Sequence, residues 1–220
     1  MKKPQILIPL IILSCLSLLV ISCKDDDDPA PTPTVYDNYA QLKVGNYWIY
    51  QHYDVDSSGN ATSTSVYDSC YVEKDTIINN LTYFKMIRPN PYPPLPSEYY
   101  LRDSLHYVID PFGNVLFSSL DFTTIFDDYY HVGSTPGDTL YRVIKKMTEK
   151  DWIVTTPAGL FQTSNMKISY HMFPNWSFAG SERAMNTRYA KNVGIVSETL
   201  PFFASNPNYL ERRLVRFHLN

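Results

Sequence analysis

Hydrophobic and polar residues alternate along most of the chain after residue 38, which is the pattern of β-strands that bury one face. The alternation is clearest over 139–148, 151–156 and 159–171. No segment keeps a helical period, although a short helix or a loop would fit Leu120–Tyr130. We therefore expect a mainly β protein with little helix. It would hold one antiparallel sheet of about ten strands, closed as a barrel or packed as a sandwich.

Turn-forming residues separate the predicted strands. Gly45-Asn46 is predicted to form a turn that leads into the first strand. Gly59-Asn60 and Gly113-Asn114 each fall between two alternating runs, where turns between strands are expected. Residues 89–97 are rich in proline, which has no N–H to donate to a neighbouring strand. We expect this segment to be a long exposed loop outside the sheet.

The last predicted strand, 208–218, carries residues of different character on its two sides. Arg212 and Arg216 share one side, whereas Val215, Phe217 and Leu219 share the other. This division predicts a strand with one solvated face, and it places Arg212 on that face.

Composition agrees with a β-rich fold and excludes some functions. The chain has 18 Tyr and 11 Phe but only 8 Gly, and aromatic residues suit pleated sheets. Loss of residues 1–22 would remove two lysines and leave 17 basic against 22 acidic side chains, a net charge of −5. A chain with this balance has no basic patch for nucleic acid, so we expect no nucleic-acid partner.

The N-terminus has the three parts of a secretory signal. Lys2 and Lys3 precede an apolar run from Ile6 to Ile21, and Ser22 is a small residue at the predicted cleavage point. The sequence Val20-Ile21-Ser22-Cys23 resembles a bacterial lipobox. That resemblance implies cleavage of residues 1–22 and lipidation of Cys23, which would attach the protein to a membrane through acyl chains. The alternative is an uncleaved membrane anchor, for which the apolar run is short.

Residues 23–37 are predicted to be a tether. Lys24 is followed by Asp25–Asp28 and then by the proline-rich stretch 29–34, which favours an extended, semi-rigid chain. The Lys-Asp-Asp-Asp-Asp run resembles the acidic export signal of Bacteroidetes-type surface lipoproteins. It implies an outer-membrane protein displayed at the cell surface, whereas a plain solvated spacer is the alternative.

Residues 38–220 are expected to form a single β-rich domain. Three of its stretches, Leu42–Tyr50, 156–161 and 189–196, resemble uncharacterised extracytoplasmic lipoproteins of bacteria. The resemblance implies a β-rich extracytoplasmic domain and brings no activity with it. Cys70 is the one cysteine left after cleavage and lipidation, and its place in an alternating run predicts a small buried core residue.

One polar segment matches part of a calcium-binding loop. Asp54, Asp56 and Ser58 occupy its first three ligand positions, and Gly59 follows. The twelfth position is Ser65 and not a bidentate Glu, so the alternative is a polar hairpin turn. No other cofactor is indicated, because the five histidines form no ligand pair at short spacing.

Two predicted loops are rich in aromatic residues and proline. Tyr92 lies in the first loop, which leads to Tyr99 and Tyr100, and the second contains Phe173, Trp176 and Phe178. Flat rings held by proline-stiffened loops suit a glycan or an envelope protein. These six residues are the candidate ligand-binding residues, and the alternative is that the rings of the second loop cap an end of the sheet.

Taken together, the sequence predicts a lipid-anchored cell-envelope protein that binds a ligand or has a structural role. The alternative is a hydrolase of the envelope or of glycans, whose site is assembled from distant strands. No sequence motif identifies catalytic residues.

Overall fold

The computed structural model describes residues 34–90, 95–135, 137–175, 181–201 and 209–220, except for the side chains of 200 and 201. The chain divides into two compact units, Met1–Val35 and Tyr36–Asn220. Every strand described below belongs to the second unit. This unit also contains its own hydrophobic core, which is the property that allows a domain to fold independently.

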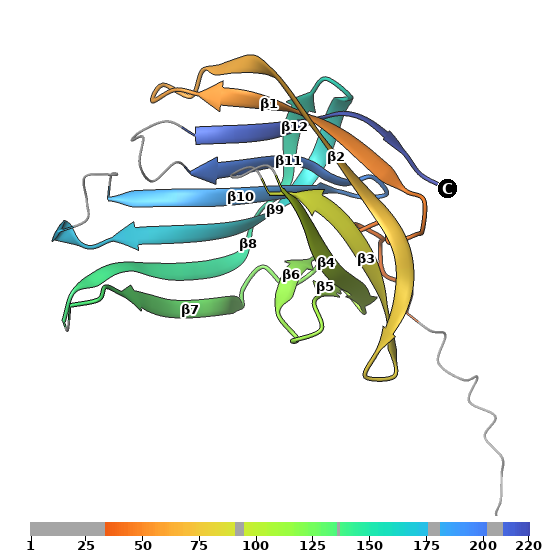
Figure 1. The fold of residues 1–220 in the computed structure, drawn as a ribbon, viewed down its shortest axis with the longest axis horizontal. Helices are drawn as coiled ribbons and strands as arrows, with labels where there is room; N and C mark the ends of the chain where they lie inside the picture. The colour runs from red at the N-terminus through yellow and green to blue at the C-terminus, as the bar shows by residue number, and fades with distance from the viewer. Residues whose placement is uncertain (1–33, 91–94, 136, 176–180, 202–208) are drawn as a thin grey trace, which may run out of the picture. The chain divides into compact units, whose positions relative to one another are not determined.

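The second unit is built from strands that form one antiparallel sheet (Figure 1). The strands are β1 Tyr47–Val55, β2 Ala61–Ile78, β3 Leu81–Pro89, β4 Pro96–Ser104, β5 Tyr107–Ile109, β6 Val115–Ser118, β7 Ile125–Val132, β8 Thr139–Thr156, β9 Gly159–Met172, β10 Glu182–Ala190, β11 Gly194–Pro201 and β12 Tyr209–His218. Their order across the sheet is β6-β5-β4-β3-β2-β1-β12-β11-β10-β9-β8-β7. The sheet therefore consists of two hairpin runs, and the first and last strands, β1 and β12, pair at its centre.

The β1–β2 and β5–β6 connections use the same local chemistry. The two turns have the sequence Asp-x-x-Gly-Asn, starting at Asp56 and at Asp110. In each turn the Asp carboxylate accepts hydrogen bonds from two backbone N–H groups and from the Asn side chain. Gly59 and Gly113 have φ of +80° and +86°, which is the conformation that glycine adopts without strain. The turn sequence alone thus sets both hairpins.

The sheet curls so that β6, at one end of the strand order, contacts β8 and β10, which lie toward the other end. Ser118 at the end of β6 donates its backbone N–H to the Sδ of Met147 on β8, at 3.4 Å. The ring of Phe117 lies 4.4 Å from the ring of Tyr189 on β10, centroid to centroid. In Figure 1 strands β3 and β4 run obliquely to the nearly horizontal β9, β10 and β11, which shows the curl of the sheet. The expected antiparallel β fold is confirmed, and one curled sheet is closer to a barrel than to a sandwich.

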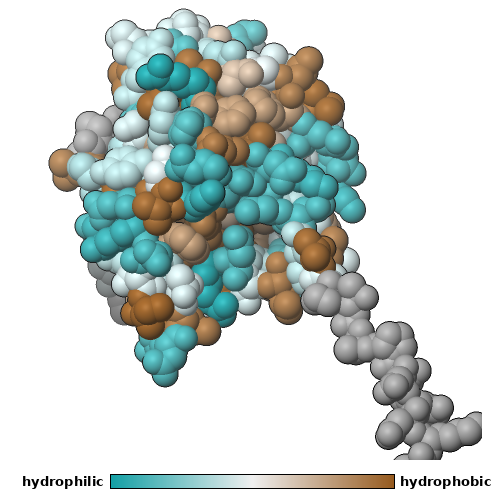
Figure 2. Space-filling view, turned by 90° about the vertical axis from the view of Figure 1, so that its right-hand side faces the viewer, coloured by the Kyte–Doolittle hydropathy of each residue, from teal (hydrophilic) through white to brown (hydrophobic). Residues whose placement is uncertain are grey.

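The inner face of the curled sheet holds the core. Alternate residues of neighbouring strands point inward and meet there, as in β1, where the burial of side chains alternates along the strand. The buried apolar residues are Ala40, Leu42, Trp48, Tyr50, Cys70, Val72, Met86, Val108, Phe117, Met147, Met166, Tyr189, Ala190, Val196 and Leu214. On the surface shown in Figure 2, hydrophobic residues lie among hydrophilic ones. No helix among the described residues is long and apolar enough to cross a bilayer.

Two local expectations were wrong. The stretch that could have been a helix contains strand β7, Ile125–Val132. The proline-rich stretch does not lie wholly outside the sheet, because Pro89 pairs with Pro96 at the ends of β3 and β4. A proline at the end of a strand lacks only its own N–H donor, so the pairing of the two strands can extend as far as that residue.

The prediction for Arg212 was also wrong. Its side chain lies on the inner face of β12 with Leu210 and Leu214 and is only 3% exposed. The strand is paired on both sides, and the carboxylates of Asp68 and Glu198 balance the buried charge. A buried arginine is stable when it is paired in this way, so alternation alone could not assign this face.

Candidate functional site

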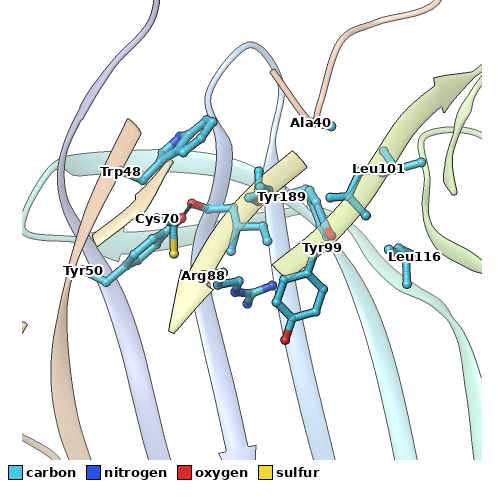
Figure 3. A pocket seen from close by; sticks show the side chains of 12 residues that line it. Ala40, Trp48, Tyr50, Cys70, Arg88, Tyr99, Leu101, Leu116 and Tyr189 are labelled. Carbon is cyan, nitrogen blue, oxygen red and sulfur yellow. Dashed lines mark hydrogen bonds between the residues drawn. The ribbon is translucent and has the colours of Figure 1, made fainter. Parts of the chain in front are cut away.

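A cavity of about 120 Å³ lies inside the curled sheet (Figure 3). Trp48, Tyr50 and Cys70 form one side, and Tyr99, Leu101 and Leu116 lie on the opposite side. The remaining lining residues are Ala40, Met86, Arg88, Val108, Tyr189 and Ile195. These residues come from eight strands and the segment before β1, so only the tertiary fold assembles the cavity. Apolar cavities of similar volume accommodate a single aromatic ring.

The aromatic wall on β1 is fixed by hydrogen bonds to the chain around β11. The indole Nε1 of Trp48 donates to the carbonyl oxygen of Val193 at 2.6 Å. The hydroxyl of Tyr50 donates to the carbonyl oxygen of Ile195 at 2.8 Å. These bonds satisfy the polar atoms of both rings and hold the rings against the cavity. They also join two of the stretches noted in the sequence, Leu42–Tyr50 and 189–196.

A cluster of buried ionic groups adjoins the cavity. Arg88 on β3 and Arg212 on β12 both form ion pairs with Oε2 of Glu198 on β11. Nη1 of Arg212 also donates to Oδ2 of Asp68 and to the carbonyl oxygen of Pro89, each at 3.0 Å. Nε2 of His52 lies 2.5 Å from the same oxygen of Asp68. The cluster connects β1, β2, β3, β11 and β12, which cross the centre of the sheet.

Charges in this cluster are matched. The two guanidinium groups face two carboxylates, and both carboxylates are ionised at neutral pH. Burial raises the pKa of Glu198, but the two arginines outweigh this effect and hold it at about 2. The pKa of Asp68 is likewise lowered, because hydrogen bonds from His52 and Arg212 outweigh its burial. Neither carboxylate can therefore act as a proton donor near neutral pH.

Arg88 is the member of the cluster that lines the cavity. Its Nη2 pairs with Glu198, and the same guanidinium carries further N–H groups at the cavity wall. Burial raises the pKa of Tyr189 to about 12 and that of Cys70 to about 11, so both groups are uncharged at neutral pH. The cavity thus combines apolar walls with the N–H groups of one guanidinium, and its described residues include no activated nucleophile.

The described residues among the aromatic residues predicted to bind a ligand lie in different elements. Tyr99 and Tyr100 belong to strand β4, and Tyr99 lines the cavity. Phe173 is half-buried, with its ring 6.1 Å from that of Tyr130. Tyr92, Trp176 and Phe178 lie outside the described residues.

The segment predicted to bind calcium is a hairpin turn. Asp56 accepts hydrogen bonds from the backbone of Ser58 and Asn60 and from the side chain of Asn60, and these bonds lower its pKa. Asp54 lies near the end of β1. No group of three or more His, Cys, Asp or Glu side chains within the described ranges could hold a metal ion. Calcium at Asp54, Asp56 and Ser58 stays a prediction, in which the ion would compete with the turn's own hydrogen bonds.

Sequence reasoning missed the ionic cluster. One signal was present in β12, where Arg212 has the same alternation parity as Leu210 and Leu214. A charged residue between two apolar residues of the same parity indicates a buried charge that needs a partner. The partner carboxylates are far away in the sequence, so their pairing with Arg212 could not be derived from it.

No known protein-family model matches the chain, and no curated protein matches it significantly. Two solved structures are similar in architecture. One is a predicted lipoprotein of Parabacteroides distasonis, 15% identical, with a TM-score of 0.47, and the alignment covers 84% of this chain and 100% of that chain. The other is a predicted exported protein of Bacteroides fragilis with a YmcC-like fold, 14% identical, with a TM-score of 0.46, covering 83% and 99%. Similarity at this level carries no information about ligand or activity.

Proposed function

We propose that this protein is a lipid-anchored envelope protein that binds a small, uncharged, mostly apolar molecule in its internal cavity. The cavity of about 120 Å³ is the observation that carries the proposal. A core usually fills such a space with side chains, because each lost contact costs stability. Here the space persists between aromatic rings that are held in place by hydrogen bonds from Trp48 and Tyr50.

The charge count favours an uncharged ligand. Arg88 is already balanced by Glu198, so a ligand carboxylate would bring an unmatched negative charge into a buried site. A neutral oxygen avoids that cost, because it can accept a hydrogen bond from an N–H group of Arg88 without adding charge. The expected ligand therefore has an apolar body about the size of one ring and one uncharged acceptor.

Small benzene derivatives test this proposal. The chain from Lys24 onward contains the whole compact unit and is titrated with acetophenone, toluene and benzoate. The binding signal is the NMR shift of the Met86 methyl group, which lines the cavity. Acetophenone should bind more tightly than toluene, and both should bind at least about tenfold more tightly than benzoate, because a charged carboxylate resists burial.

Two variants locate the binding. Ala40→Leu places extra carbons in the cavity and should abolish binding of acetophenone. Val108→Ala enlarges the cavity and should shift preference toward a longer ketone such as butyrophenone. Val132→Ala, on the exposed edge strand β7, is the matched control and should change neither. Melting curves establish that each variant is folded. Absence of binding by every ring compound would contradict the proposal.

The proposed location of the protein, anchored by lipid and displayed at the cell surface, rests on the N-terminal sequence. Val20-Ile21-Ser22-Cys23 supports lipidation, and the following Asp25–Asp28 run supports display at the cell surface. A protein anchored in this way would present its cavity to molecules outside the cell. Replacing Asp25–Asp28 with alanine should reduce digestion by protease added to intact cells while total lipoprotein stays constant. Unchanged digestion would indicate that the acidic run is only a spacer and does not direct export to the surface.

A further inference from the structure

A second hollow lies next to the cavity. It is open to solvent, has a volume of about 650 Å³, and is bordered by the β2–β3 turn, by β4 and by the β5–β6 turn. Pockets of this volume commonly hold a small ligand. Tyr99, Leu101 and Leu116 line both this outer hollow and the inner cavity. Figure 3 shows these three side chains together on one side of the cavity. Among the described lining residues, only these three side chains border both the outer hollow and the inner cavity.

Exposure supports continuity between the two spaces. Tyr99 is 40% exposed although it also borders the enclosed cavity, so its ring reaches from the interior to solvent. Leu101 and Leu116 are only half-buried. Side-chain rotation of an exposed residue such as Tyr99 is fast, and it needs no change in the strand that carries it. A ligand can therefore extend past Tyr99 from the cavity into the outer hollow.

The chemistry of the outer hollow differs from that of the cavity. Phe112, at the tip of the β5–β6 turn, is 90% exposed, and Tyr100 lies on the neighbouring strand β4. Asn79, Glu98 and Asp110 add amide and carboxylate groups. Flat rings next to hydrogen-bond acceptors suit a molecule that has both C–H faces and hydroxyl groups, whereas the cavity itself suits an alkyl chain or ring.

We propose that the cavity and the outer hollow form one elongated site for an uncharged amphiphile, with an alkyl end inside and a hydroxyl-bearing head, such as a sugar ring, outside. This inference rests on the proposed function, because the cavity must first accept an apolar group. Glu98 also pairs with Lys85, and Asp110 also binds its own turn, so the hydroxyl groups bind to the remaining lone pairs of these two carboxylates. The ring of Phe112 packs against the face of the head.

Alkyl β-glucosides below their micellar concentrations test the elongated site. Butyl, hexyl and octyl glucosides are titrated into the chain from Lys24 onward and compared with hexanol and with glucose. Hexyl glucoside should bind at least about tenfold more tightly than hexanol. Affinity should rise about fourfold per methylene up to a chain that fills the cavity, roughly six carbons, and then level off, since each buried CH₂ contributes about 0.8 kcal/mol.

Substitution of Phe112 distinguishes binding in the outer hollow from binding in the inner cavity. Phe112→Ala should weaken hexyl glucoside about fivefold and leave hexanol unchanged, because this ring lines only the outer hollow. Ala40→Leu should weaken both compounds. Leu120→Ala, which removes another exposed apolar side chain, is the matched control and should affect neither. Exposed positions such as Phe112 and Leu120 should leave the melting temperature unchanged.

The possible outcomes distinguish this inference from the proposed function. Binding of hexanol with no gain from the sugar, or a gain that Phe112→Ala does not reduce, overturns the elongated site and leaves cavity binding intact. Binding of neither hexanol nor any glucoside overturns both proposals. The expected pattern of chain length and of the two variants supports both.

Discussion

The indole Nε1 of Trp48 donates a hydrogen bond to the carbonyl oxygen of Val193, with 2.6 Å between the two atoms. The next residue, Gly194, has φ of +105°, and a Cβ built on it would lie 3.0 Å from the same indole nitrogen. The bend before β11 therefore needs glycine for two reasons, the backbone conformation and the close approach of Trp48. The same contact positions one wall of the cavity.

Gly194→Ala should lower the free energy of unfolding by about 2–4 kcal/mol, because it combines an unfavourable φ with a steric clash. Gly59→Ala is the matched control. Its φ is +80° but no atom lies within 4 Å of the added Cβ, so the cost should be about 1 kcal/mol. Urea unfolding of both variants measures the difference. Equal losses in the two variants would show that contact with Trp48 contributes nothing.

Stability should fall when the solution is acidified through the range in which Glu198 titrates. Its pKa is about 2 in the folded protein, below its ordinary value of 4.5, so the unfolded chain binds a proton first. The ionised carboxylate therefore stabilises the fold above about pH 4.5, and this contribution is lost as the pH falls to about 2. The loss should be on the order of 3 kcal/mol. Asp68 contributes in the same direction.

Glu198→Gln tests this assignment. The variant should lose about 3–5 kcal/mol at pH 7, because it leaves Arg88 and Arg212 without their shared carboxylate. It should also lack part of the stability change between pH 4.5 and 2. Urea unfolding at several pH values measures both effects, with the exposed Glu182→Gln as control. The same acid dependence in the Glu198 variant as in the wild type would refute the assignment.

The thiol of Cys70 should be unreactive in the folded protein. It is buried in the cavity wall, and burial raises its pKa to about 11. Only about one thiol in a thousand is then ionised at pH 8, and the thiolate is the reactive form. In the chain from Lys24 onward Cys70 is the sole cysteine. Its reaction with Ellman's reagent should be slow in buffer and fast in denaturing urea, and comparable rates in the two solutions would argue against a buried thiol.

Lipidation should depend on Cys23. Growth of a bacterial host with an alkyne fatty acid should label the wild-type protein, because the lipobox-like sequence places this thiol at the processing site. Cys23→Ala should be unlabelled, and Cys70→Ala should be labelled normally. The test fails for the proposal if the Cys23 variant carries as much label as the wild type.

Local sequence determined the turns and the general type of the fold. The Asp56 and Asp110 turns follow from short-range hydrogen bonds and glycine conformations, which depend on five consecutive residues. Alternation likewise predicted strand β9, because the side-chain period of a strand is a property of the backbone itself. It divided β8 into two strands, 139–148 and 151–156, because the irregularity between Thr148 and Trp152 interrupts the alternation within one continuous strand. The predicted burial of Cys70 is confirmed for the same reason.

Only the tertiary structure decided which residues form the site. Arg212 is buried because strands far away in the sequence bring Asp68 and Glu198 to it, and electrostatic pairing across a sheet leaves no mark on the local pattern. Pro89 stays in the ladder because it lies at its end, and its carbonyl oxygen accepts a hydrogen bond from Arg212. The cavity has the same origin. Its lining comes from eight strands, and the space between them depends on how far the whole sheet curls, which no single segment specifies.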